Sequence, residues 1–138
     1  MVSLKRWLAA AACSIAGAGQ AQTTATLHLG GVDVTAEVAT DPAAQARGLT
    51  GHAPLGRNAG MLFPLQPARR VCLWMRDTEQ ALSAAFIDSA GEVIDTIELI
   101  PGDPTYRCAS GLASYALELP AQWLSTHDVR PGDHVSGL

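Results

Sequence analysis

Apolar and polar residues alternate in short runs along most of the chain after residue 23. Within residues 24–39, Leu27 and Leu29 are separated by a polar residue, and the alternation resumes after the Gly30-Gly31 pair. Successive side chains of a β-strand point to opposite faces, so a repeat of two residues is typical of a strand buried on one face. We therefore predict two short strands in this segment, joined by a hairpin turn at the two glycines.

Five later segments have the length and apolar content of strands. Residues 71–75 are apolar on both faces, which predicts a central strand, whereas residues 60–63 form a shorter apolar run that ends at Pro64. Turn residues at 89–91 separate two apolar runs and indicate a second hairpin. The predicted strands are 60–63, 71–75, 84–88, 92–99 and 114–119, with a last short strand close to the C-terminus.

Two short helices are predicted between these strands. Residues 40–48 begin with a Thr-Asp pair that suits a helix cap, carry Pro42 in the first turn and end at Gly48. Residues 120–128 open with Pro120 and form the second predicted helix. Many short strands at close spacing predict a mainly β fold, a small antiparallel β-sandwich or partly closed barrel with two short α-helices.

The first 21 residues follow a different pattern. Lys5 and Arg6 precede a short apolar run, and small residues stand at the two positions that define a cleavage site after Ala21. This order is typical of a secretory signal peptide. The apolar run is shorter than the ~20 residues that a spanning helix needs, which favours a cleaved signal over a membrane anchor. We expect an exported protein, periplasmic or secreted, with a single mainly β domain over residues 22–138.

Removal of the signal peptide leaves an acidic chain. Seven Arg residues stand against thirteen Asp and Glu residues, a net charge of −6, and no Lys remains. Schiff-base chemistry and lysine phosphate clamps are thereby excluded. The negative charge also argues against nucleic acid and anionic membranes as partners.

Two cysteines, Cys72 and Cys108, remain in the expected mature chain. An even pair in an exported protein predicts a disulfide. The alternatives are a redox pair or half of a metal site, although redox pairs usually lie close together in sequence. A bond between them would hold the Pro- and Gly-rich loop 100–111.

The segment "VCLWMRDT" at residues 71–78 contains the highest density of reactive side chains. Strand alternation places Trp74 and Arg76 on one face, where they could bind a flat or anionic ligand. The alternative is Trp74 packed against the disulfide as core, with Arg76 paired to an acid. Asp77 and Thr78 end the predicted strand. Asp77 could be a general base or a ligand anchor. The alternative is that both residues cap a turn.

Two further charged residues are candidates for the same site. Arg47 closes the first predicted helix, where a positive charge suits the helix C-terminus, and it could also join Arg76 on an acidic ligand. Glu118 lies between Leu117 and Leu119, so it faces away from them. It either faces solvent or is the counter-ion of one of these arginines.

No familiar metal or nucleophile motif occurs in the sequence. The His residues are scattered without ligand spacing, and no Ser residue occupies a nucleophile elbow. No metal site and no cofactor are therefore expected. The His residues are His28, His52, His127 and His134.

Six islands, in this order and at this spacing, together resemble the domain of unknown function family 192 (DUF192) of bacteria and archaea. The resemblance covers about residues 26–135 and implies a compact, mostly β domain, often behind an export signal. It brings no established reaction or ligand. The islands are "ARGLTG" (46–51), "GMLF" (60–63), "CLWMRDT" (72–78), "AFIDSAGEVI" (85–94), "YALEL" (115–119) and "PGDHV" (131–135).

This chain departs from the pattern of the family that it resembles. Asp77 stands where the family typically has Asn, and Ala81-Leu82-Ser83 stands in place of Pro-Leu-Asp. Thr50 occupies a position that is usually Met. A family function that depends on that Asn and Asp would be altered in this chain.

Three functions fit these observations. We expect a periplasmic module that binds a small molecule or an envelope protein in a groove. One alternative is a cell-envelope hydrolase that uses Asp77 and Glu118 as acid and base, and the other is a structural accessory without a ligand site. The expected groove residues are Arg47, Trp74, Arg76, Asp77, Thr78 and Glu118.

Overall fold

The computed structural model describes residues 22–138, so the predicted signal peptide at 1–21 lies outside the described residues. The mainly β class with two short helices is confirmed. Across residues 22–138, no helix is long and apolar enough to cross a membrane. The elements are β1 Thr24–Leu29, β2 Val32–Val38, α1 Pro42–Arg47, β3 Ala59–Arg69, β4 Cys72–Leu73, β5 Leu82–Ile87, β6 Val93–Leu99, β7 Arg107–Cys108, β8 Ala113–Pro120 and α2 Trp123–Thr126.

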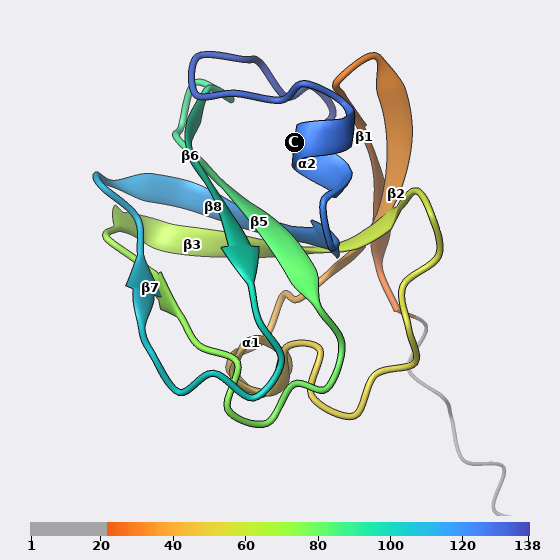
Figure 1. The fold of residues 1–138 in the computed structure, drawn as a ribbon. Helices are drawn as coiled ribbons and strands as arrows, with labels where there is room; N and C mark the ends of the chain where they lie inside the picture. Colours follow the sequence, from red (N-terminus) through yellow and green to blue (C-terminus); the bar gives the residue numbers. More distant parts are fainter. Residues whose placement is uncertain (1–21) are drawn as a thin grey trace, which may run out of the picture.

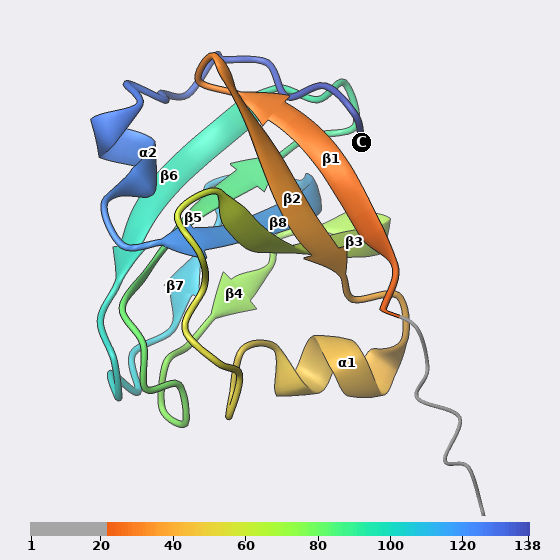
Figure 2. The same cartoon turned by 90° about the vertical axis from the view of Figure 1, so that its right-hand side faces the viewer.

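Six of the strands form one twisted sheet in the order β1-β2-β3-β8-β5-β6 (Figures 1 and 2). The sheet is mixed, because β2 pairs parallel with β3 while the other neighbours are antiparallel. A parallel pair needs a long crossover, and residues 39–58, which include α1, provide it. The sheet is open and does not close into a barrel, with β1 and β6 at its two edges.

Both predicted hairpins are present, but two predicted boundaries were wrong. β3 continues through Pro64 to Arg69, and its register against β8 becomes irregular only after that proline. Pro120 ends β8 and does not open a helix; α2 is a single turn that begins at Trp123. Proline restricts its own backbone, but a strand tolerates it where the hydrogen-bond ladder ends or is irregular.

The prediction of a central strand at residues 71–75 was also wrong. Only Cys72–Leu73 is a strand, β4, and it pairs with the two residues of β7 in a separate small sheet. The strand that is buried at every position is β5, which lies between β8 and the edge strand β6. The apolar run at 71–75 covers one face of the large sheet, so Met75 is buried while Trp74 is 42% exposed.

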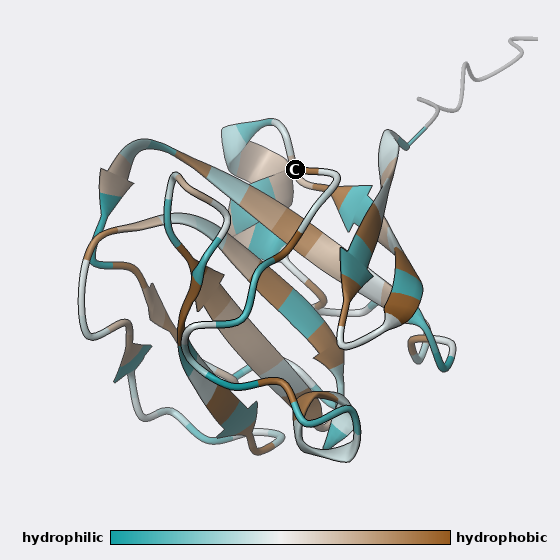
Figure 3. Ribbon diagram, turned by 90° about the horizontal axis from the view of Figure 1, so that it is seen from above, coloured by the Kyte–Doolittle hydropathy of each residue, from teal (hydrophilic) through white to brown (hydrophobic). Residues whose placement is uncertain are grey.

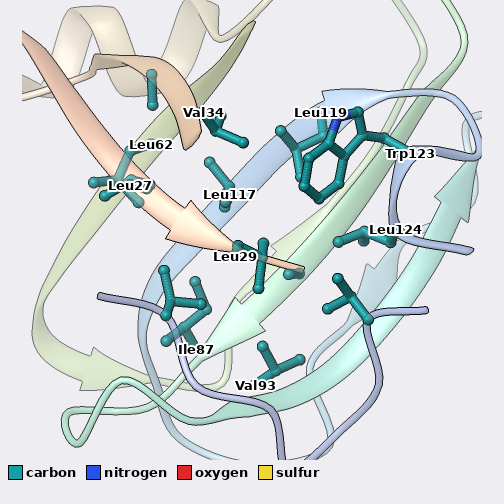
Figure 4. Close-up of a cluster of buried hydrophobic side chains, with 14 residues drawn as sticks. Leu27, Leu29, Val34, Leu62, Ile87, Val93, Leu117, Leu119, Trp123 and Leu124 are labelled. Carbon is teal, nitrogen blue, oxygen red and sulfur yellow. The ribbon is translucent and has the colours of Figure 1, made fainter. Parts of the chain in front are cut away.

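The large sheet separates two hydrophobic clusters. On one face, the β1–β2 hairpin, α2 and the C-terminal segment cover a cluster in which Trp123 lies beside Leu119 (Figure 4). On the other face, α1 and the β4 segment cover a cluster that includes Phe63 and Phe86. Hydrophobic stretches run along the sheet strands and hydrophilic residues are prominent in the loops (Figure 3).

Candidate functional site

A cavity of about 390 Å³ opens on the second face of the sheet, between α1, the β4 segment and strands β3 and β8. Five of the six predicted groove residues line it, although they come from distant parts of the chain. Arg76 is the exception and lies outside this cavity. The predicted residues that line it are Arg47, Trp74, Asp77, Thr78 and Glu118.

Glu118 is the one acidic side chain buried in the described part of the chain, with 7% of its surface exposed. β8 places it between β3 and β5, where its direct neighbours across the sheet are Met61 and Ala84. Leu117 and Leu119 point to the opposite face and are fully buried there. Strand alternation therefore fixes Glu118 on the cavity face, and of the two alternatives for this residue the solvent-facing one was wrong.

Burial raises the pKa of the Glu118 carboxyl to about 7 from its ordinary value of 4.5. Desolvation destabilises the charged form, and no nearby cation offsets it. Within residues 22–138, no hydrogen bond contributes to the pKa of this carboxyl and no arginine forms an ion pair with it. The predicted counter-ion role toward Arg47 or Arg76 is thus not realised in the described chain. Every fully buried side-chain oxygen there has a partner, so the Glu118 oxygens retain contact with the cavity space.

The cavity rim carries two exposed guanidinium groups, from Arg47 and Arg69. Arg47 ends α1, which is capped by the Asp41 side chain. Gln45 fixes α1 to the sheet, because its amide nitrogen donates to the Pro64 carbonyl at 2.7 Å. Within the described residues, neither guanidinium forms an ion pair. Sequence reasoning missed Arg69, since its position on the rim depends on β3 running past Pro64.

Asp77 and Thr78 belong to a turn that is held in place by backbone hydrogen bonds to the loop after β6. The Met75 carbonyl accepts from Thr78 at 3.2 Å and from Gly102 at 2.9 Å. Asp77 is exposed at the rim, while Thr78 is buried with 8% of its surface exposed. Asp77 and Glu118 therefore line the same cavity, the first exposed to solvent and the second buried.

Trp74 stands on the rim in an aromatic stack and is not packed as core. Its ring lies parallel to that of Tyr106 with centroids 5.2 Å apart, and the Arg76 guanidinium lies 4.7 Å from its centroid. The stack is held by the small β4–β7 sheet, in which Cys72 and Cys108 are directly opposite and form a disulfide. The predicted disulfide is confirmed, and Cys72 is part of the cavity wall.

A second group of polar residues lies on the other side of α1. His52 contacts the Glu37 carboxylate at 3.1 Å, and its other ring nitrogen contacts the Ala53 carbonyl at 2.6 Å. The backbone contact is the main cause that raises the pKa of His52, and Glu37 adds to it against the opposing effect of burial. In residues 22–138, no three His, Cys, Asp or Glu side chains gather closely enough to hold a metal ion.

Ser83, where the resembled family has Asp, does not line the cavity. It is fully buried in β5, and its hydroxyl donates to the Pro120 carbonyl at 2.9 Å. By contrast, Asp77 and Thr50 both line the cavity.

Comparison with protein families finds one match that spans nearly the whole described chain. The model of the DUF192 family, described as uncharacterized ACR, matches residues 25–137. None of the curated proteins matches the chain.

Two of the solved structures that are similar to this chain come from two bacteria. One is a protein from Sinorhizobium meliloti 1021, provisionally described as a transcription regulator, with 29% identity and a TM-score of 0.80 over 84% of this chain and 95% of that one. The other is a protein of unknown function from Novosphingobium aromaticivorans DSM 12444, with 27% identity and a TM-score of 0.75 over 83% and 84% of the two chains.

Proposed function

This chain belongs to the DUF192 family of uncharacterised proteins, and from that premise we propose that it is an exported module that binds a small molecule in the cavity between α1, the β4 segment and the sheet. The single observation that carries this proposal is Glu118, a buried carboxyl without a partner in the described chain, on the wall of a cavity of about 390 Å³. A strongly perturbed pKa in a concave site is a signature of functional positions.

The Cys72–Cys108 disulfide supports the exported location. Disulfides form and persist in oxidising compartments and are rare in the cytosol. The predicted signal peptide supports the same location. The net charge of −6 for residues 22–138 argues against nucleic acid as a partner, because phosphate contacts are made by Lys and Arg clusters. We therefore do not extend the description of the Sinorhizobium meliloti protein to this chain.

Ligand-observed NMR with a library of small polar metabolites tests the binding function directly. We expect hits that bind wild-type protein and are lost in Thr50→Trp, because Thr50 is exposed on the cavity rim and a bulky side chain there blocks entry. The matched control is Thr126→Trp, at an exposed position on α2 outside this cavity. A library that gives no hit, or hits that survive Thr50→Trp, would contradict the proposal.

A cell-envelope hydrolase is the second candidate, favoured by one specific observation. Asp77 is exposed and Glu118 is buried, yet both carboxyls line one cavity. Pairs of carboxyls whose environments separate their pKa values are typical of acid–base catalysis. Assays with chromogenic esters and glycosides test this function. A hydrolase should turn over one of these substrates and lose that turnover in both Asp77→Asn and Glu118→Gln. A binding module should show no turnover even in the wild-type protein.

An envelope protein is the alternative partner, and the exposed Trp74–Tyr106 stack beside Arg76 supports it. Aromatic and Arg side chains are enriched where proteins bind one another. In vivo crosslinking through a photoreactive residue at position 106 tests this partner. A crosslink that Trp74→Ala or Arg76→Ala abolishes would place the function on the stack. If neither this test nor the metabolite library gives a signal, the structural accessory becomes the better reading.

A further inference from the structure

At the two ends of the cavity, polar groups of opposite kind lack a hydrogen-bonding partner among the described residues. At the buried end, the Glu118 carboxyl has burial as the only cause of its raised pKa, without a hydrogen bond or an ion pair from any described residue. At the rim, Arg47 and Arg69 have donors that meet no acid within residues 22–138. A ligand that satisfies both ends must carry a donor at one end and an acceptor at the other.

Three other charged residues line the same cavity as Glu118, and each comes from a different element. α1 contributes Arg47, the end of β3 contributes Arg69, and the turn after β4 contributes Asp77. The side chains opposite Glu118 on β3 and β5 are Met61 and Ala84, which carry no charge. The buried end thus carries one charged residue, the acid Glu118, while the rim carries two positive groups and one negative group.

From this arrangement we infer that the ligand is a small zwitterion, with an ammonium group that pairs with Glu118 and a carboxylate that pairs with Arg47 and Arg69. Amino acids and short peptides are the chemical class with these two groups. The inference rests on the proposed binding function and names the ligand class of the same cavity.

Burial is what favours an ammonium group over a neutral donor at Glu118. An ionised carboxylate removed from water is stable only when it is paired and hydrogen-bonded, and an ammonium group provides both. Planar guanidinium groups match a carboxylate in the same way at the rim. Between the two ends, Leu49, Phe63 and Leu65 line the wall and suit the aliphatic spacer of such a ligand.

The pairing makes binding depend on pH in a definite direction. The ammonium group binds the ionised form of Glu118, and burial raises the pKa of this carboxyl to about 7. Apparent affinity falls in proportion to the competent fraction, so it should be about tenfold weaker at pH 6 than at pH 8. A ligand bound through neutral Glu118 would show the reverse dependence.

A series of ω-amino acids tests the inference and measures the distance between the two ends. Glycine, β-alanine, 4-aminobutyrate and 6-aminohexanoate carry the same two charged groups on spacers of increasing length. Isothermal titration at pH 8 should find one length that binds best. The amino acid of that length should also bind roughly tenfold or more tightly than n-butylamine and than butyrate, because each of these lacks one charged hydrogen-bonding group.

Three variants assign the two ends. Glu118→Gln should remove the preference for the amino acid over butyrate and abolish the pH dependence. Arg47→Gln should weaken the preference over n-butylamine, since Arg69 still pairs with the carboxylate, and should keep the pH dependence. Arg57→Gln, at an exposed loop position outside the cavity lining, is the matched control and should bind as wild type. Circular dichroism of each variant verifies folding.

The outcomes separate this inference from the proposed function. If the metabolite library gives Thr50-dependent hits but these are neutral molecules or simple anions, the zwitterion is wrong and the cavity still binds a ligand. If affinity for the best ω-amino acid rises toward pH 6, the ammonium–Glu118 pair is wrong. If neither the library nor the series binds wild type, both proposals fail together.

Discussion

Glu118 is a buried acid on a strand, in the cavity that we propose to bind a ligand. Its neighbours Leu117 and Leu119 bury their side chains on the far face of β8, which forces the carboxyl onto the cavity face. Removing an acid from water without a partner destabilises its charged form. Natural proteins accept such a cost at functional positions, because activity often requires a locally unfavourable group.

Glu118→Gln is expected to stabilise the protein at alkaline pH and to leave it almost unchanged at pH 4. The folded-state pKa is raised, so between pH 4.5 and about 7 the native state holds a proton that the unfolded state releases. Stability therefore falls as pH rises through this window. At 1.36 kcal/mol per pKa unit, Glu118→Gln should gain about 3 kcal/mol at pH 8. Urea unfolding at pH 4 and pH 8 measures the difference.

An exposed carboxyl provides the control for this prediction. Glu79→Gln removes the charge of an acid that directly follows Thr78, but Glu79 is exposed to solvent, so its effect should be within ±0.5 kcal/mol at both pH values. Equal stability of wild type and Glu118→Gln at pH 8 would mean that the carboxyl is hydrated or paired in solution.

The sequence places Glu118 on the right face of its strand but does not say what covers that face. Alternation in "YALEL" separates it from Leu117 and Leu119, and this part of the prediction holds. Burial follows from the packing of α1 and the β4 segment over β8, and these contacts join residues far apart in the chain. Periodicity carries no information about such long-range contacts. A Glu118 side chain that faces solvent and one that faces a cavity were therefore equally compatible with the sequence.

Among the elements, β3 and β8 approach so closely at Gly60 that a side chain has no room. A Cβ atom at this position would lie 2.6 Å from the Glu118 carbonyl oxygen and 3.0 Å from a methyl group of Leu119. Gly60→Ala must therefore push the two strands apart, at a cost of about 1–3 kcal/mol. Thermal unfolding measures this cost. Gly56→Ala is the control, because a Cβ there meets only Ala59 at an ordinary 3.8 Å.

The β4–β7 pair depends on its disulfide more than on its hydrogen bonds. The strands have two residues each, and Cys72 and Cys108 close a loop with a sequence separation of 36. The double variant Cys72→Ser/Cys108→Ser should lose roughly 4 kcal/mol, mainly through the greater freedom of the unfolded chain. Reductant should lower the unfolding midpoint of wild type and leave that of the variant unchanged. A wild-type midpoint insensitive to reductant would show that the bond does not form.

The error at residues 71–75 has a physical cause at the level of elements. Both faces of this run are apolar, which is typical of a central strand, but Arg107 and Cys108 provide pairing partners for only two of its residues. The remaining apolar side chains cover the face of the large sheet or stack with Tyr106. Local hydrophobicity predicts burial and not hydrogen-bond partners, so it did not distinguish a strand from a covering segment.

At the scale of the whole molecule, the two faces of the large sheet carry side chains of different size. The face under the β1–β2 hairpin and α2 is packed with large side chains such as Leu27, Leu117 and Trp123 (Figure 4). The opposite face contains more small residues, among them Ala84 and Ala116 beside Glu118, and this leaves room for the cavity. One face thus holds the larger side chains of the core, while the other contains the cavity that we propose to bind a ligand.

The proposed exported location makes a prediction for the full chain expressed in a bacterium that has a periplasm. The periplasmic fraction should contain a protein whose mass corresponds to residues 22–138 with one disulfide, because the small-residue motif places cleavage after Ala21. Intact-mass spectrometry before and after reduction measures both features. A chain that starts at Gln22 is the control and should stay in the cytoplasm, with two free thiols.

The control also connects the location of the protein to its cavity. Cys72 lies in the cavity wall, and the disulfide holds Trp74 and Tyr106 together at the rim. Reduced protein from the cytoplasm should therefore bind the cavity ligand more weakly than oxidised protein from the periplasm, and reoxidation should restore the affinity. Full-length chain that accumulates in the cytoplasm with residues 1–21 attached would contradict export. Equal affinity of the two forms would show that the cavity does not need its disulfide.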